Sequence, residues 1–500
     1  MTHGNVGREG TSRCQHSETN KKGNGIMNLK KWLTGILFCT LAGLVVGCGG
    51  GSTSTPPVPQ QQTGTMFVTG TDAPLPSVVS FQVDITGLTV SDGVNPPVSI
   101  LNGTQTVDFA RLNGLRTLLD INTIPAGTYT QVTATLANPQ IGYLNVANPQ
   151  TNPPTRPTIS NLNSTTSPAV TLTTSSVTIT LVQPLIVAAN DIIGLKFEFD
   201  LRKSIAVDGT GQITGMVTPN LDLKAITPTD SDAFIDDFVS GVVSVAGNSF
   251  VVQGPHGHQF TVNVNDQTEF EGGETLANIS PSSIVEISGT LDRLSHAILA
   301  DSVGIVSQDK FWAGGLITFV DPPTGTATDF DLYVRNVLPA GTGFNSGQIS
   351  TIDLTGNEKY FIYWMHNVFV NPHFSNIFFN SGLLVPGQHV SIAGPFNNGT
   401  ITVKRVVLRH EGHNGAWVVG STNPGASTFQ INSNGLAGVL FSGPVTVYVT
   451  PFTRFRGGLN SINDLQGTAT LPLRVVGLIL KDPVSGQPVF VARSVELLSN

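Results

Sequence analysis

Cysteine is nearly absent from this sequence, and the few cysteines lie close to its start. Cys14, Cys39 and Cys48 are the three cysteines among 500 residues. A chain without cysteine after Cys48 can form no disulfide, zinc–thiolate site or cysteine nucleophile in its folded part. Thiol chemistry is therefore excluded from whatever the folded part does.

Charge is scarce as well. Charged residues make up 12% of the chain, which is about half of the roughly 25% that is usual in soluble proteins. The formal net charge is −8 at pH 7, and no cluster of lysine and arginine follows the first 31 residues. We therefore expect no nucleic-acid partner, because such partners need a basic surface.

Long helices are also not expected, because no segment repeats apolar residues at helical spacing while 54 glycines and 31 prolines interrupt the chain. Apolar and polar residues alternate instead in "FQVDITGLTV" (81–90), "VTITLV" (177–182) and "GLKFEFDL" (194–201). Alternation with a period of two is typical of half-buried strands. The sequence predicts an all-β protein, with a β-sandwich domain over 66–228.

The composition changes abruptly at Cys48. Lys30 and Lys31 precede an apolar run over 33–46, and glycine, serine, threonine, proline and glutamine follow Cys48. The apolar run is shorter than the about 20 residues that span a bilayer, whereas its basic start and small final residues are typical of an export signal. We predict a signal region over 1–47 with its true start at Met27. Residues 48–65 are then a flexible tether.

The residues "VVGC" (45–48) resemble the lipobox of bacterial lipoproteins. The resemblance implies that Cys48 carries the lipid, that the signal is removed before it, and that the membrane is a partner through this anchor. Three acyl chains exceed the two anchors that stable attachment needs. Gly49 stands where lipoproteins of the inner membrane often have aspartate, which favours the outer membrane within the cell envelope. The alternative is an ordinary secretory signal with an incidental cysteine.

The second half of the chain repeats itself. "QTEFEGG" (267–273) recurs as "FTRFRGG" (452–458), whereas "VNPHF" (370–374) stands in the expected place of this motif in the middle unit. Repeats of this kind indicate a series of similar modules. We predict three small β-barrel-like units after a linker: the linker covers 229–237, and the units cover 238–309, 311–409 and 414–498.

Two uncharacterised families resemble these regions. "TDAP" (71–74), "LLDINTIPAGTYTQVTATL" (118–136) and the segment 197–223 are similar to a domain of unknown function that is common in bacterial lipoproteins. The repeat units resemble a second uncharacterised family of small β-barrel-like domains, which is also found in such proteins. These resemblances imply a β-sandwich followed by barrels, and they imply no activity.

The linker region contains four aspartates within "TPTDSDAFIDDF" (227–238). They invite a calcium interpretation, but the glycine and glutamate of an EF-hand loop are missing from their places. A solvated linker is the simpler interpretation. The aspartates are Asp230, Asp232, Asp236 and Asp237.

Two histidine-containing segments could hold a metal. In "RHEGH" (409–413) the histidines are three residues apart, whereas H-E-x-x-H needs two histidines four residues apart on a helix. In "GPHGHQ" (254–259) two histidines flank a glycine in an expected hairpin loop. We expect polar turns, no metal and no cofactor. The weak candidate ligands are His256, His258, His410, Glu411 and His413.

The segment "KYFIYWMHNVFVNPHFSNIFF" (359–379) is unusually rich in aromatic residues. Tyr360, Tyr363 and Trp364 would suit a sugar ring or an apolar partner if they faced water. The alternative is that they form the core of the middle unit.

No catalytic motif is evident, and three functional hypotheses remain. The favoured one is a non-catalytic, lipid-anchored envelope protein whose β modules bind a glycan or an envelope protein, or act as structural spacers. The second is an envelope enzyme that acts on a polymer such as a glycan, which would need two carboxylates at a defined separation. The third is a metal-handling protein that uses the loop histidines.

Overall fold

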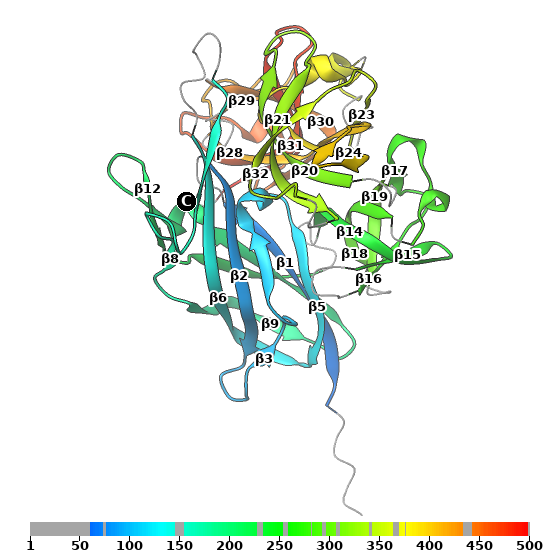
Figure 1. Cartoon of the computed structure of the whole chain (residues 1–500). Coiled ribbons are helices and arrows are strands. Elements are labelled where there is room, and N and C mark those ends of the chain that lie inside the picture. Colours follow the sequence, from blue (N-terminus) through cyan, green and yellow to red (C-terminus); the bar gives the residue numbers. More distant parts are fainter. Residues whose placement is uncertain are drawn as a thin grey trace, which may run out of the picture. The chain divides into compact units, whose positions relative to one another are not determined.

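The computed structural model shows an almost entirely β-stranded protein, which confirms the predicted all-β fold class (Figure 1). Apart from short 3-10 turns, the helix of the described part is α1 (Leu201–Ser204). No helix in the ranges that follow is long and apolar enough to cross a membrane. The structure describes residues 61–73, 77–145, 155–227, 234–253, 259–281, 283–292, 297–306, 311–339, 343–363, 370–375, 377–433 and 443–498.

The N-terminal module is a sandwich of two main sheets that share one core. One sheet has the strand order β13-β10-β1-β5, and the other has β3-β2-β6-β7 with β4 and β9 added to β2 and β6. The alternating residues predicted to be buried do face this core, where the rings of Phe81 and Phe199 lie 4.9 Å apart. The strands are β1 (Thr63–Ala73), β2 (Val78–Ser91), β3 (Val98–Ser99), β4 (Gln105–Asp108), β5 (Thr117–Pro125), β6 (Gly127–Asn145), β7 (Thr158–Leu162), β9 (Ser176–Val187), β10 (Ile192–Asp200) and β13 (Leu221–Ile226).

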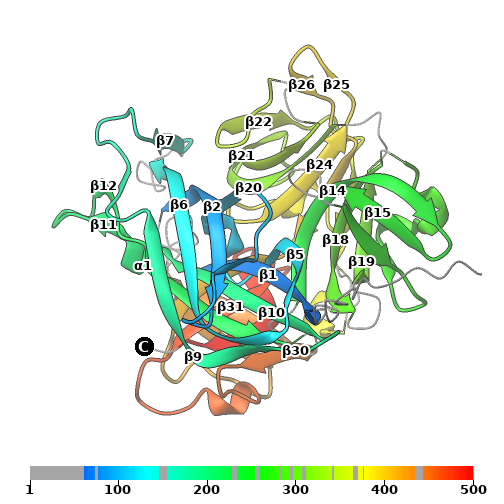
Figure 2. The ribbon, with the colours of Figure 1, turned by 90° about the horizontal axis from the view of Figure 1, so that it is seen from below.

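A small third sheet borders the sandwich, with the order β11-β12-β8 (Figure 2). The tight turn between β5 and β6 uses the "PAGTY" sequence. Pro125 ends β5, Gly127 begins β6, and the hydroxyl of Tyr129 donates to the carbonyl of Pro125 at 2.8 Å. The strands of the small sheet are β8 (Thr171–Leu172), β11 (Ile205–Val207) and β12 (Ile213–Val217).

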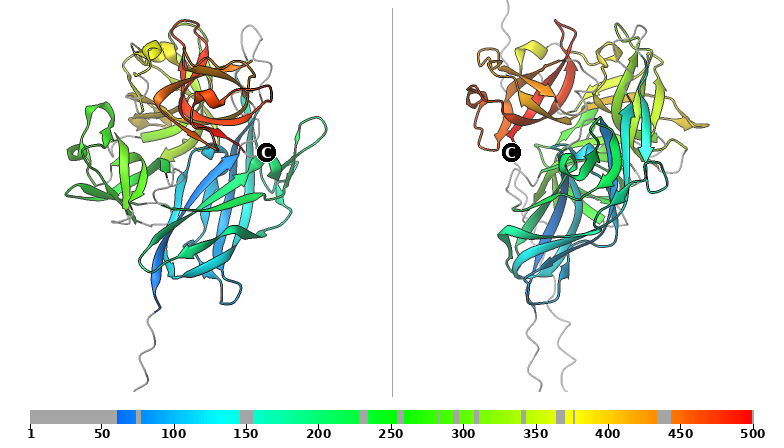
Figure 3. Two further views of the ribbon diagram at one scale, coloured as in Figure 1. Left: turned by 180° about the vertical axis from the view of Figure 1, so that it is seen from behind. Right: turned by 90° about the vertical axis from the view of Figure 1, so that its left-hand side faces the viewer.

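Three sheets with the same strand order follow, and we call them the first unit (234–306), second unit (311–409) and third unit (411–497). In the first unit the order is β16-β15-β14-β18-β19, and β16 also pairs with β19, so the five strands form a ring. The third unit is a closed barrel, β28-β29-β30-β32-β31 (Figure 3). The second unit repeats the order as β22-β21-β20-β24-β27-β23.

The bounds of these strands follow the chain in the same sequence in each unit. The first unit contains β14 (Phe234–Ala246), β15 (Ser249–Gln253), β16 (Gln259–Asn263), β17 (Glu269–Phe270), β18 (Ile284–Asp292) and β19 (Ala297–Val306). The second contains β20 (Phe311–Asp321), β21 (Asp329–Leu338), β22 (Ile349–Asp353), β23 (Lys359–Ile362), β24 (His389–Gly394) and β27 (Arg405–Arg409), with the short pair β25 (Phe396–Asn397) and β26 (Thr400–Ile401). The third contains β28 (Glu411–Trp417), β29 (Thr428–Ser433), β30 (Val445–Arg456), β31 (Pro472–Lys481) and β32 (Pro488–Leu497).

The repeated T-x-F motif occupies equivalent places in the first and third units. Phe270 pairs in parallel with Val303 of β19, and Phe455 pairs in parallel with Val495 of β32. The glycine that ends each copy, Gly273 or Gly458, has a φ of +75° or +92°, which favours glycine because it has no Cβ. The motif therefore joins a strand end to the last strand and then turns the chain.

The middle unit corrects one expectation. Its equivalent of the motif is not "VNPHF" (370–374), because Tyr360 of β23 pairs in parallel with Val406 of β27 in the same way. The "VNPHF" segment instead contains the 3-10 turn Pro372–Phe374. Sequence matching by the spacing of Thr and Phe missed the equivalence, because tyrosine replaces phenylalanine and the threonine is absent.

The threonine of the motif closes each copy through its side chain. The hydroxyl of Thr268 donates to the carbonyl of Ala300 at 2.7 Å, and the hydroxyl of Thr453 donates to that of Ala492 at 2.6 Å. We expect Thr453→Val to lower the free energy of unfolding by about 1 kcal/mol, because one intramolecular hydrogen bond is lost. Urea unfolding of the purified protein measures this. Thr261→Val on exposed β16 is the control and should change stability by less than about 0.5 kcal/mol; an equal effect of both changes would contradict the prediction.

The predicted linker is shorter than expected. Strand β14 begins at Phe234, so the second half of the segment 229–237 is the first strand of the first unit. Asp236 is buried in this strand and forms an ion pair with Arg493 of β32. Its carboxylate is therefore used in packing between units, not in a solvated linker. Asp230, Asp232 and the side chain of Asp237 lie outside the described residues.

Candidate functional site

The "RHEGH" segment (409–413) lies where the second unit passes into the third. Arg409 ends β27, Glu411 begins β28, and His410 is the single residue between these strands. The side chains of this segment are buried, and successive residues contact different modules. We call it the junction segment, and the next paragraphs follow its contacts.

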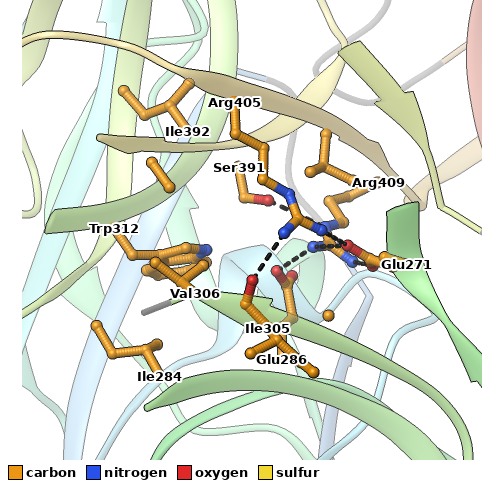
Figure 4. Close-up of a pocket in the computed structure, with 13 residues that line it drawn as sticks. Glu271, Ile284, Glu286, Ile305, Val306, Trp312, Ser391, Ile392, Arg405 and Arg409 are labelled. Carbon is orange, nitrogen blue, oxygen red and sulfur yellow. Dashed lines mark hydrogen bonds and ion pairs between the residues drawn. The ribbon is translucent and has the colours of Figure 1, made fainter. Parts of the chain in front are cut away.

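Arg409 joins the second unit to the first (Figure 4). Its guanidinium forms ion pairs with the carboxylates of Glu271 and Glu286, the latter at 2.5 Å. Arg405 adds a second guanidinium, which donates to Glu271 at 2.8 Å and to the carbonyl of Ile305 at 2.7 Å. The cavity that remains beside these groups measures about 10 Å³, close to the smallest space that holds one water molecule. This seam is packed and leaves no room for a ligand.

Glu411 joins the third unit to the second. Its two carboxylate oxygens accept hydrogen bonds from the guanidinium of Arg335 on β21, at 2.7 and 3.2 Å. Both side chains are buried. Burial raises the pKa of Glu411, although Arg335 acts in the opposite direction. The only carboxylate of the junction segment is therefore fully engaged by one arginine.

Gly412 and the neighbouring strand β31 contact the sandwich. The carbonyl of Gly412 accepts a hydrogen bond from the side-chain amide of Asn113. Arg474 of β31 forms an ion pair with Glu198 of β10 at 3.0 Å. Burial alone would raise the pKa of Glu198, but Arg474 and Lys196 outweigh it and lower this pKa to about 2. Glu198 is therefore an anion at neutral pH, held by two cations.

The histidines around the junction segment are held neutral. Burial and the nearby Arg335 lower the pKa values of His389 and His413 to about 3. Burial and two arginines, Arg493 and Arg409, place the pKa of His410 well below its ordinary value. The ring of His413 packs edge-on against Phe490 with the centroids 4.7 Å apart, and neither of its nitrogens has a hydrogen-bond partner among the described residues.

The metal interpretation of these histidines finds no support in the geometry. Within the described ranges, no three His, Cys, Asp or Glu side chains are grouped so that they could hold a metal ion. His410, Glu411 and His413 are all buried, and Glu411 is bound to Arg335. The other two candidates, His256 and His258, lie outside the described residues.

The aromatic segment divides between a core position and a buried junction position. Tyr363 is only 3% exposed, its ring lies edge-on to that of His410 at 5.0 Å, and the guanidinium of Arg409 lies 5.0 Å from its centre. Tyr363 therefore does not face water, which corrects the hypothesis of a surface platform at this position. Tyr360 is half-buried, and burial followed by Glu358 raises its pKa to about 12. Trp364 lies outside the described residues.

A groove that the sequence did not indicate lies between the second and third units. Its volume is about 970 Å³, at the upper end of the range for small-molecule sites. His373 from the second unit and Tyr448 and Asp482 from the third unit line it. His373 was within a quoted motif, but nothing in the sequence indicated that it meets a tyrosine and an aspartate more than seventy residues away. We call this feature the unit 2–3 groove.

Asp482 organises the unit 2–3 groove. Its carboxylate lies 2.6 Å from Nε2 of His373 and accepts from the hydroxyl of Tyr448 at 3.3 Å. Burial alone would raise the pKa of Asp482, but hydrogen bonds from the backbone of Ser485 and from His373 lower it to about 2. Burial and Asp482 raise the pKa of Tyr448. At neutral pH a carboxylate anion thus accepts hydrogen bonds from both rings.

Comparison with known families agrees with the two resemblances. Residues 63–214 match a family described as a domain of unknown function (DUF4382), and residues 240–303 match a second one (DUF5666). The first match covers most of the sandwich, and the second lies within the first unit. None of the curated proteins that were compared matches the chain significantly. The family matches carry no activity to any residue.

Proposed function

We propose that this chain is a non-catalytic, lipid-anchored protein of the cell envelope, in which four β modules form one joined block that binds or spaces other envelope components. One observation carries the proposal: buried polar contacts connect the modules in a closed series. The backbone N–H of Asp236 in the first unit donates to the carbonyl of Arg116 in the sandwich at 2.7 Å, and ion pairs make the other connections. These pairs are Arg409–Glu286 (first and second units), Arg335–Glu411 (second and third), Arg474–Glu198 (third unit and sandwich) and Arg493–Asp236 (third and first).

Apolar packing supports the same conclusion. The core around Phe330 and Val390 of the second unit continues into Leu478 and Val491 of the third. A further core combines residues of the first unit with Phe67 of the sandwich. Modules within one chain move relative to each other unless their interfaces are extensive and apolar. Shared cores and buried ion pairs together oppose such motion, as a spacer or a rigid binding block requires.

The enzyme hypothesis has less support in the described groove. Hydrolysis of a glycan generally uses two carboxylates on either side of the bond. The lining of the unit 2–3 groove contains one, Asp482, and both of its oxygens already accept hydrogen bonds. Binding therefore fits this groove better than hydrolysis.

The anchor at Cys48 and the outer-membrane location are parts of the proposal that rest on the sequence, because Cys48 lies outside the described residues. In a chain that starts at Met27, we expect Cys48→Ser to abolish labelling with a radioactive fatty acid and to move the protein from the membrane fraction to the soluble fraction. Three acyl chains hold a protein on a bilayer, and the tether alone does not. Cys39→Ser is the matched control and should stay in the membrane fraction. An unlabelled parent protein, or a membrane-bound Cys48→Ser protein, would contradict the anchor.

A further inference from the structure

The unit 2–3 groove contains two aromatic rings in a fixed parallel arrangement. The rings of His373 and Tyr448 stack with their centres 4.9 Å apart and their planes 15° apart. They come from different units, and the same carboxylate of Asp482 accepts a hydrogen bond from each. Phe374 supports Tyr448 from the side, edge-on at 5.0 Å. The pair of rings is therefore ordered before any ligand arrives, which lowers the entropic cost of binding.

The carboxylate that holds these rings is not itself presented to a ligand. The side chain of Asp482 is only 6% exposed. One oxygen accepts from the backbone N–H groups of Val484 and Ser485, at 2.9 and 2.6 Å, and from the Ser485 hydroxyl at 3.0 Å. The other oxygen faces the two rings. A charged ligand would find no unpaired carboxylate in this part of the groove.

The rest of the lining is polar but nearly free of charge. Lys481 and Asp482 are its two formally charged residues other than the histidine, and their charges cancel. Apolar ring edges alternate with hydroxyl and amide groups, a combination that suits a ligand with apolar ring faces and many hydroxyl groups. The prolines are Pro323, Pro386, Pro444 and Pro488, and the uncharged polar residues are Thr324, Thr446, Ser485 and Gln487.

We propose that the unit 2–3 groove binds a neutral saccharide chain. The C–H face of a sugar ring packs against the aromatic pair, and the threonine, serine and glutamine side chains exchange hydrogen bonds with its hydroxyl groups. A cationic or anionic polymer fits less well, because the charges of the lining cancel. This inference goes beyond the proposed function, which requires only the anchor and the joined modules and would survive if the groove bound nothing.

Isothermal titration calorimetry on the detergent-solubilised full-length protein tests the inference. The probes are maltohexaose, cellohexaose and chitohexaose, three neutral oligosaccharides of equal length, with decaproline as the peptide alternative because proline-rich peptides also bind aromatic grooves. We expect at least one oligosaccharide to bind with a Kd below about 1 mM. Failure of all three to bind, or binding of decaproline alone, would overturn the proposal.

Variants place any binding in the groove. We expect His373→Ala and Tyr448→Ala each to weaken saccharide binding at least tenfold. Val484→Arg tests the same point without touching the core, because Val484 lines the groove and is 84% exposed; it should also weaken binding at least tenfold while the melting temperature stays unchanged. Phe452→Ala removes an exposed aromatic ring that is not part of the lining, and it should bind as the parent does. Unchanged affinity in Val484→Arg and His373→Ala would overturn the assignment to this groove.

Discussion

Gly412→Ala is expected to destabilise the protein by more than about 4 kcal/mol, in the range where single substitutions are exceptional. A Cβ built on Gly412 overlaps the backbone carbonyl of Asn113 in the sandwich. No rotation of a side chain can relieve this overlap, because the obstructing atom belongs to the backbone. Either the loop that contains Asn113 or strand β28 must move, and the movement separates the sandwich from the third unit.

The measurement is urea unfolding of the purified full-length protein, followed by tryptophan fluorescence. Gly241→Ala is the matched control, since Gly241 also lies in a first strand of a unit and has no atom within 4 Å of a built Cβ. It should change stability by less than about 1 kcal/mol, as expected for an uncrowded site. Equal unfolding midpoints for the two variants would show that the junction segment does not pack against the sandwich as described.

Acid is expected to destabilise the protein strongly below pH 6.5. The pKa values of His389 and His413 are lowered to about 3, and that of His410 lies well below 6.5. In the unfolded chain each histidine binds a proton near pH 6.5, whereas in the folded chain it stays neutral. The unfolded state therefore binds more protons as the pH falls from 6.5 towards 3, and stability falls with it. Full stability from this source is present above pH 6.5.

The size of this effect follows from the number of histidines. One histidine that stays neutral on folding lowers stability by about 2 kcal/mol between pH 7 and pH 5, so three lower it by about 5 kcal/mol. Urea unfolding at pH 7 and pH 5 measures the difference. His413→Phe should reduce it by about a third, because phenylalanine keeps the ring packing against Phe490 and does not titrate. Equal stability at pH 7 and pH 5 would mean that these histidines are not held neutral.

The sequence was enough to predict the strands and the repeat, because both depend on local patterns. Alternation of apolar and polar residues sets which face of a strand is buried, and that is visible at Phe197 and Phe199 of β10. The T-x-F motif marked equivalent places at Phe270 and Phe455, since each copy makes the same local contact with its own last strand. The equivalence of Tyr360 was hidden, because the contact is kept by a different residue pair.

Only the tertiary structure decided what the histidines and carboxylates do. "RHEGH" has metal-capable residues at close spacing, but Glu411 is neutralised by Arg335, 76 residues earlier, and Arg409 by glutamates of another unit. The partners of a buried charge come from long-range packing, which local sequence does not record. The unit 2–3 groove has the same origin: His373 and Asp482 are 109 residues apart and meet because two units pack together. The sequence by itself determined that the protein is built of β modules, whereas the packing between modules determined where a ligand could bind.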